Sequence, residues 1–198
     1  MNALTRRLTP LLFVVGLLTL SGCGINNIPT YDEQVKAAWA QVENQYQRRA
    51  DLVPNLVETV KGFATQERET LQAVVEARAK VSQMNVSSDI LDNPQAFQAF
   101  EQNQAALSSA LSRLMVVVER YPDLKSNQNF LTLQSQLEGT ENRISVARRD
   151  YIQAVQQYNT EIRTLPGSIW HSLMYSDMPI RETFEASAGA EQAPQVEF

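Results

Sequence analysis

The sequence of 198 residues has one cysteine, one histidine and only seven glycines. A single cysteine leaves no partner for a disulfide, and no His or Cys set has the spacing of a metal site. His171 has no cysteine or carboxylate cluster beside it, and we expect it to pack at the edge of the solvent. There is no G-x-S-x-G motif and no glycine-rich phosphate loop. We therefore predict no cofactor, no metal and no enzymatic activity.

No hydrophobic run is long enough to span a membrane. The main apolar stretch, residues 11–20, is about ten residues long, whereas a transmembrane helix needs about twenty. Arg6 and Arg7 precede this stretch, and a serine and a glycine follow it, which is the order of a secretory signal. We therefore predict a signal peptide over residues 1–22.

The lone cysteine follows this signal directly. Leu-Ser-Gly-Cys, which ends at Cys23, resembles the bacterial lipobox, whose cysteine is acylated and becomes the first residue of the mature protein. A single acyl chain binds a membrane only marginally. This resemblance implies a diacylglycerol group and an N-acyl chain, which are enough for stable attachment. In Gram-negative bacteria, an aspartate directly after the acylated cysteine resembles an inner-membrane retention signal, but this chain has Gly24 at that position. The absence of the aspartate favours the periplasmic face of the outer membrane. We predict that residues 23–30 form the acylated cysteine and a short polar tether.

Positive charge is also scarce. The chain has 17 Lys and Arg against 22 Asp and Glu, and removal of residues 1–22 changes the formal net charge from −5 to −7. Nucleic-acid binding depends on neutralising phosphates with Lys and Arg, so we predict no nucleic-acid partner. The same charge gives no attraction to anionic lipid, and the acyl chains must therefore do the anchoring.

Three apolar stripes run through the chain, with spacings that mostly alternate between threes and fours, as on one face of a helix. Such narrow stripes are typical of helices that pack into a bundle. Scarce glycine and plentiful Ala, Gln, Glu, Leu and Arg also favour helix. The stripes consist of Val35, Trp39, Val42, Tyr46, Val53, Leu56, Val60, Phe63, Leu71, Val74 and Val81; of Phe97, Phe100, Gln104, Leu107, Leu111, Leu114, Val118 and Tyr121; and of Phe130, Leu133, Leu137, Thr140, Ile144, Ala147, Tyr151, Ala154 and Tyr158.

Prolines mark the ends of the second and third helices. Pro94 lies just inside the start of the second helix, which is a favoured position, and Pro122 ends it. The third helix is expected over residues 127–164, with Pro166 as its stop. Short links between long amphipathic helices mean antiparallel neighbours. We therefore predict an all-α protein with an antiparallel four-helix-type bundle over residues 31–166.

Pro54 lies inside the first stripe, where it removes one helical hydrogen bond and clashes with the carbonyl of Ala50. Two interpretations follow. Either Asp51 caps a new helix with Pro54 in its first turn, or one long helix kinks at Pro54. The stripe keeps its phase from Tyr46 to Leu56, which a hairpin would not require. We therefore favour the kinked helix.

Two charged residues, Arg49 and Glu67, stand where the first stripe expects apolar side chains. The interpretation that we favour places both at the rim of the stripe, with their heads in water. A second interpretation is a buried ion pair or polar layer with Gln104 or Thr140 from neighbouring helices. A catalytic carboxylate at Glu67 is a third.

The C-terminal part changes character. We predict a short helical extension over residues 167–186, with an apolar patch at 169–174 and a last helix over 177–186. Residues 187–198 are small and polar and are expected to be a disordered tail. The tail ends in apolar–any–apolar with a free carboxylate at Phe198, which suits the groove of a PDZ domain. A PDZ-bearing envelope protein is therefore one candidate partner.

Long stretches of the chain resemble the LemA family. The resemblance is densest in AWAQVENQYQRRADLVPNLVETVKGFATQERETLQAVVEARAKV (Ala38–Val81) and continues in YPDLKSNQNFLTLQSQLEGTENRISVARRDYIQAVQQYN (Tyr121–Asn159). The ending APQVEF (Ala193–Phe198) is also similar. The resemblance implies a four-helix, bundle-like fold at the cell envelope and no established enzymatic activity. Many members look anchored by an N-terminal transmembrane helix, and the lipobox is a departure from that pattern.

The family-like stretch that begins Tyr-Pro-Asp-Leu-Lys has two interpretations. It is either a connector between two helices, whose polar side chains satisfy the helix ends, or a partner-binding loop that uses Tyr121, Asp123 and Lys125.

Location, stripes and the missing reactive cluster together favour a non-enzymatic, lipid-anchored envelope protein that acts as a helical scaffold or protein-interaction module. The alternatives are an envelope hydrolase that uses acidic residues such as Glu67 or Glu76, and a receptor for a small apolar ligand held between the helices. The sequence leaves the partner and the oligomeric state open.

Overall fold

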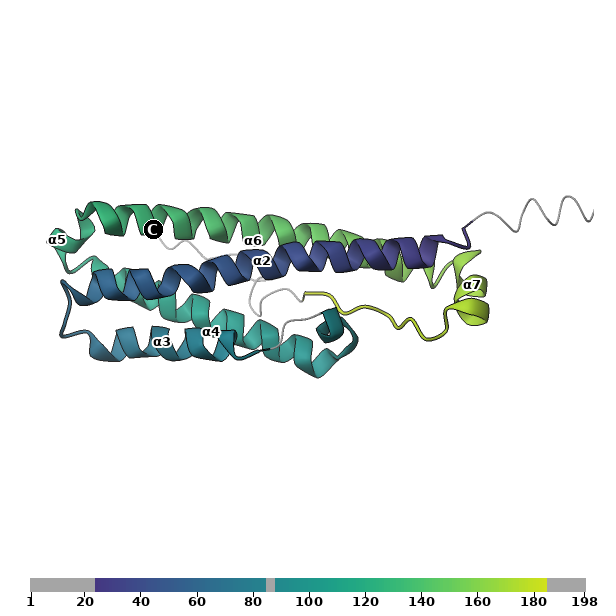
Figure 1. Cartoon of the computed structure of the whole chain (residues 1–198), viewed down its shortest axis with the longest axis horizontal. Helices are drawn as coiled ribbons and strands as arrows, with labels where there is room; N and C mark the ends of the chain where they lie inside the picture. Colours follow the sequence, from purple (N-terminus) through teal and green to yellow (C-terminus); the bar gives the residue numbers. More distant parts are fainter. Residues whose placement is uncertain (1–23, 85–87, 185–198) are drawn as a thin grey trace, which may run out of the picture.

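The structure, a computed structural model, describes residues 24–84 and 88–184 (Figure 1). Cys23 and Phe198 lie outside the described residues, as do the predicted signal peptide and tail. Helices make up most of the described chain, which contains no strand, so the prediction of an all-α bundle is confirmed. The elements are α2 (Asn27–Lys61), α3 (Arg68–Ser82), the 3₁₀ turn η1 (Ser88–Asp92), α4 (Pro94–Val118), α5 (Pro122–Lys125), α6 (Gln128–Glu161) and α7 (Gly167–Met174).

The long helices α2, α3, α4 and α6 lie side by side, with α5 at one end of the bundle and α7 at the other (Figure 1). Asn27 Nδ2 donates to Glu161 Oε1 at 3.1 Å, and Arg49 Nη1 contacts Glu141 Oε1 at 2.9 Å. Rising residue numbers in α2 thus pair with falling numbers in α6, and these two helices run in opposite directions. Helix α2 packs along α6 and α3, and α3 packs along α4.

Buried side chains from the three stripes form two apolar clusters, one toward each end of the bundle. Trp39 lies at the centre of the aromatic cluster at the α7 end, with ring centroids 5.2 Å from Phe100 and 5.3 Å from Tyr151. Phe63 was expected in the first stripe but is 43 % exposed, because α2 ends at Lys61 and the chain turns before α3.

Helix α2 continues through Pro54, and the interpretation in which Asp51 caps a new helix is wrong. The carbonyl that the proline cannot bond is that of Ala50. This carbonyl accepts a hydrogen bond from Arg78 Nε of α3 at 3.3 Å. A neighbouring helix therefore replaces the bond that the proline removes, and the helix can continue.

The predicted tether is shorter than residues 23–30. Helix α2 begins at Asn27, so 27–30 form its first turn instead of a free linker. The reason is packing: Ile28 is fully buried in the aromatic cluster, and Asn27 bonds to Glu161 of α6. Only three described residues, 24–26, precede the helix.

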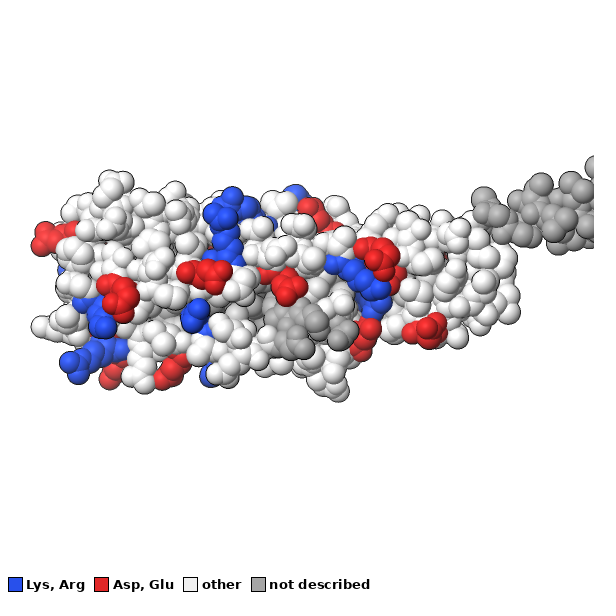
Figure 2. All heavy atoms as spheres, viewed as in Figure 1, with Lys and Arg blue, Asp and Glu red and all other residues white. Residues whose placement is uncertain are grey.

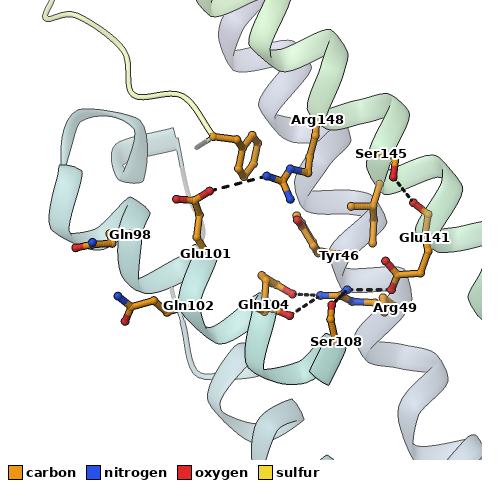
Figure 3. Close-up of a pocket in the computed structure, with 13 residues that line it drawn as sticks. Tyr46, Arg49, Gln98, Glu101, Gln102, Gln104, Ser108, Glu141, Ser145 and Arg148 are labelled. Atoms are coloured by element: carbon orange, nitrogen blue, oxygen red, sulfur yellow. Dashed lines mark hydrogen bonds and ion pairs between the residues drawn. The ribbon is translucent and has the colours of Figure 1, made fainter. Parts of the chain in front are cut away.

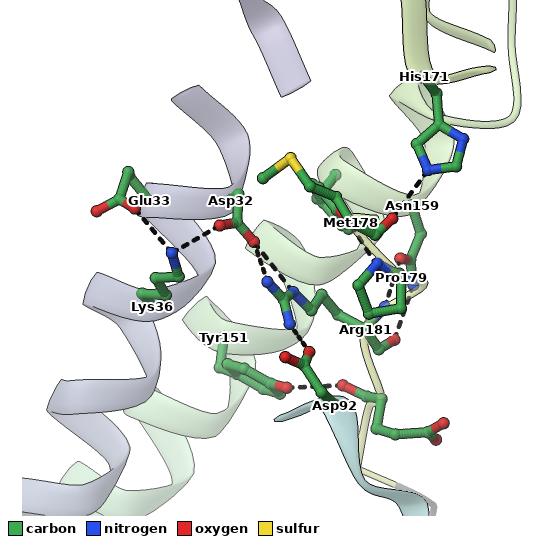
Figure 4. A network of polar contacts seen from close by, with 12 residues as sticks. Asp32, Glu33, Lys36, Asp92, Tyr151, Asn159, His171, Met178, Pro179 and Arg181 are labelled. Carbon is green, nitrogen blue, oxygen red and sulfur yellow. Dashed lines mark hydrogen bonds and ion pairs between the residues drawn. The ribbon is translucent and has the colours of Figure 1, made fainter. Parts of the chain in front are cut away.

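The prediction of a last helix over 177–186 is wrong for its described part. Helix α7 ends at Met174, and residues 175–184, here named the C-terminal strap, contain no helix. Side chains of α6 bond the backbone of the strap: Tyr158 Oη donates to the Pro179 carbonyl at 2.9 Å, and Tyr151 Oη donates to the Glu182 carbonyl at 2.7 Å (Figure 4). The strap carbonyls therefore accept hydrogen bonds from side chains of α6 instead of the backbone hydrogen bonds of a helix.

A buried ion pair also holds the C-terminal strap. Arg181 donates to Asp32 Oδ1 through Nε at 3.0 Å and also through Nη2, and both side chains are almost fully buried (Figure 4). Arg181 makes a second ion pair with Asp92 of η1. Asp32 also binds Lys36 at 2.8 Å, and this hydrogen bond raises the pKa of Lys36. The strap is thereby joined to α2, α6 and η1.

We expect alkaline pH to weaken the hydrogen bond from Tyr158 to the C-terminal strap and so to lower the free energy of unfolding. Burial raises the pKa of Tyr158 to about 12 from its ordinary value of 10.0. The folded protein thus holds this proton more tightly than the unfolded chain, so the stabilisation is complete below pH 10 and is lost as the pH rises toward 12. Urea unfolding between pH 8 and about 11 should show a fall in the free energy of unfolding that is smaller in Y158F. Equal slopes for the two proteins would contradict this account.

Candidate functional site

A cleft of about 630 Å³ lies between α4 and α6, on the side of the bundle where these two helices flank α2 (Figure 3). Helix α2 supplies Tyr46 and Arg49 at its floor. Gln98, Glu101 and Gln102 lie on the α4 wall, and α6 contributes polar side chains to the opposite wall. Most of the lining side chains are polar or charged, which suits a polar ligand or a peptide better than an apolar molecule.

Arg49 is the centre of the cleft floor and is only 2 % exposed. Its Nη1 donates to Ser108 Oγ at 2.7 Å and to Glu141 Oε1 at 2.9 Å, and its Nη2 donates to both the side chain and the backbone carbonyl of Gln104 (Figure 3). Its guanidinium also lies 4.9 Å from the centre of the Tyr46 ring. Arg49 Nε is buried and has no hydrogen-bond partner among the described residues. The guanidinium thus joins α2, α4 and α6 at one level.

Rim placement is therefore wrong for Arg49, and the interpretation as a buried polar layer is correct. The layer lies between the two apolar clusters and includes Gln104, as expected. Thr140 is buried at the same level, but its hydroxyl donates to the Gln136 carbonyl of its own helix and not to Arg49. Ser108 was not predicted as a member of the layer, although it lies four residues after Gln104 and so on the same side of α4.

A second charge pair crosses the cleft nearer its mouth. Arg148 Nη2 of α6 lies 3.9 Å from Glu101 Oε1 of α4 (Figure 3). The Arg148 guanidinium carbon lies 4.2 Å from the centre of the Phe184 ring. The C-terminal strap thus reaches the cleft through its last described residue. Burial raises the pKa of Tyr46, while Arg148 and Arg49 oppose this shift, so the phenol keeps its proton at neutral pH.

The predicted partner-binding residues of the connector do not line this cleft. Tyr121 Oη donates to Glu67 Oε1 at 2.9 Å, which raises the pKa of Tyr121, and Arg120 pairs with the same carboxylate at 3.1 Å. Asp123 is exposed in the first turn of α5, and Lys125 pairs with Glu119. These contacts fit a connector that closes one end of the bundle.

Reactive groups are not gathered in the cleft. Within residues 24–84 and 88–184, no group of three or more His, Cys, Asp and Glu could hold a metal ion. His171 lies on α7, where its Nε2 is 2.8 Å from the Met178 carbonyl. Glu76 is exposed on α3 and accepts from Gln72, and neither Glu76 nor Glu67 lines the cleft. The arrangement can bind through charge and hydrogen bonds, and the carboxylates considered for hydrolysis lie elsewhere.

Comparison with known proteins decides the family. The profile of the LemA family matches residues 38–198, which is most of the chain. The chain belongs to the LemA family. Two magnetosome proteins of Paramagnetospirillum magneticum, MamQ 1 and MamQ 2, are each 26 % identical to it over 166 residues, which cover 76 % of this chain and 60 % of each relative. Protein LemA of Metamycoplasma hominis is 22 % identical over 139 residues, which cover 70 % of this chain and 59 % of that protein.

The match spans about 60 % of the length of these curated relatives, so it does not carry over what the whole proteins do. Membership of the LemA family supports a helical, envelope-associated protein, and the LemA and MamQ proteins are not known enzymes. The helices of the described residues include none that combines the length and apolar character needed to cross a bilayer.

Proposed function

We propose that this LemA-family protein is attached to the cell envelope by lipid on Cys23 and works by contact, as a helical scaffold or protein-interaction module, without catalysis. Outer-membrane attachment on the periplasmic side is part of this proposal. The lipobox-like sequence before Gly24 supports the anchor, and family membership supports the envelope. A PDZ-bearing partner at Phe198 stays a prediction that is separate from the cleft described above.

The observation that carries the contact role is the cleft between α4 and α6. Its floor is fixed by Arg49, whose bonds to Gln104, Ser108 and Glu141 give it one defined position. Its rim presents the exposed amides of Gln98 and Gln102, which lie four residues apart on one face of α4. Amide side chains both donate and accept hydrogen bonds, as a peptide backbone does. The cleft therefore suits an extended segment of another envelope protein.

The other candidate functions are less well supported by this geometry. A receptor for a small apolar ligand needs a cavity lined mainly by hydrophobic side chains. This cleft is open, and although Ile144 and Phe184 line it, most of its lining side chains are polar or charged. A hydrolase needs two carboxylates in different environments that face one substrate, and Glu67 and Glu76 do not share a cleft.

Crosslinking in living cells tests the contact role. A photo-reactive amino acid at Gln102, on the cleft rim, should form a covalent adduct with a discrete envelope protein. The matched control is the same substitution at Gln72, an exposed glutamine on α3 that does not line the cleft. Adding S145W, which fills the cleft from α6, should remove the adduct at position 102. Identical adducts from both positions, or an adduct that persists in S145W, would contradict the proposal.

A further inference from the structure

Helix α7 lies beside the place where the chain leaves the predicted anchor. It is at the same end of the bundle as the start of α2 and packs against that helix (Figure 1). A Cβ on Gly24 would be only 3.7 Å from Pro166 Cγ, so Gly24 lies against the residue that precedes α7. Cys23 directly precedes Gly24 in the sequence. The described part of the chain therefore begins against the residue that precedes α7.

Several large apolar side chains are exposed on α7 and just before it, beside the exposed Ser172. Leu165, Ile169, Leu173 and Met174 are all at least half exposed, with Leu165 at 76 % and Leu173 at 72 %. Ile169 and Leu173 are four residues apart and share one face of the helix. Exposed apolar residues that occur singly are normal, but a cluster of this kind marks an interaction site. We name these four residues the α7 face.

The segment that carries the α7 face has no formal charge. Residues 164–176 contain no Lys, Arg, Asp or Glu, although one residue in five of the whole chain is charged. Figure 2 shows the consequence: the end of the bundle around α7 is almost free of blue and red side chains in this view, whereas charged side chains lie along the rest of the molecule. Entry of residues 164–176 into a low-dielectric layer would therefore not require the desolvation of a charged side chain within that segment.

We infer that the α7 face is a membrane contact, which dips into the boundary between headgroups and acyl chains of the bilayer that holds Cys23. This inference rests on the proposed lipid anchor. Lipid is the occupant because the residue that would carry the acyl chains directly precedes Gly24, and Gly24 lies against Pro166 at the start of α7. A helix as short as α7 would bind lipid weakly by itself, but a tethered contact acts at a high effective concentration. The bundle is thereby oriented, with α7 toward the bilayer and α5 away from it.

Spin labelling of the acylated full-length protein tests this orientation. Cys23 is the only cysteine and its sulfur is occupied by lipid, so a nitroxide attaches at one engineered thiol. The test position is Ser172 of α7 (S172C), and the matched control is Ser126 beside α5 (S126C); both are exposed serines at opposite ends of the bundle. The protein is reconstituted in vesicles of phosphatidylethanolamine and phosphatidylglycerol, and collisions with oxygen and with a water-soluble nickel chelate are measured.

The label at position 172 should lose most of its access to the nickel chelate and gain access to oxygen, as expected for a helix about 5–10 Å into the interface. The label at position 126 should stay in water. Full aqueous access at 172 in vesicle-bound protein would overturn the membrane contact while leaving the anchor intact. Insertion of both labels would overturn the end-on orientation, and dipolar broadening at 172 would show that a second copy covers the α7 face instead. If C23S remained on membranes as wild type does, the anchor itself would fail.

Discussion

R49A is expected to lower the free energy of unfolding by about 3 kcal/mol, the lower end of the cost of breaking a buried charged contact. The substitution removes the donors that satisfy Gln104 and Ser108 and leaves a cavity between the two apolar clusters. Glu141 is 44 % exposed and can be hydrated again, which keeps the cost at that lower end. Urea unfolding followed by circular dichroism measures the loss.

Two variants separate the causes of this loss. R49M keeps most of the side-chain volume but has no donors, so it should fall between wild type and R49A. R148A removes the other arginine of the cleft, whose pair with Glu101 is partly exposed and 3.9 Å long, and should cost less than about 1 kcal/mol. Wild-type stability in R49M would contradict the view that the polar layer holds α2, α4 and α6 together.

R181A has the second large expected effect, a loss of about 3–5 kcal/mol with release of the C-terminal strap. Asp32 is almost fully buried and, among the described residues, would keep Lys36 as its charged partner. Hydrogen exchange should show fast exchange in residues 175–184 while the amides in the middle of α6 stay protected.

The control for R181A lies one residue after Asp32. Glu33 also pairs with Lys36 but is 73 % exposed, so E33A should cost less than about 1 kcal/mol and leave the strap protected. A strap that stays protected in R181A would show that the side-chain bonds from Tyr151, Tyr158 and Asn159 of α6 hold it without the ion pair.

Local sequence signals predicted the long helices well. Pro94 begins α4 as expected, and Asn127 caps α6, where its side chain accepts from the backbone N–H groups of Asn129 and Phe130. The break between α2 and α3 was not predicted, because the apolar stripe resumes in phase with Leu71 after the turn. Gly62, directly after the last residue of α2, was the available signal for that break.

The C-terminal strap could not be predicted from local patterns. Its conformation depends on partners that are distant in sequence: Pro179 is bonded by Tyr158, and Arg181 by Asp32. The same holds for the candidate site. Arg49 was conspicuous as a charge in an apolar stripe. Its pairing with Ser108 and Glu141 could not be predicted, because it depends on how α4 and α6 pack against α2.

Intact-mass spectrometry of the protein purified from its own envelope tests the central claim most directly, because both the anchor and the orientation of the bundle depend on the chemistry of Cys23. The account predicts a chain that begins at Cys23, with a mass that exceeds residues 23–198 by a diacylglycerol and one further acyl chain. A chain that still begins at Met1, or one whose cysteine carries a free thiol, would contradict it.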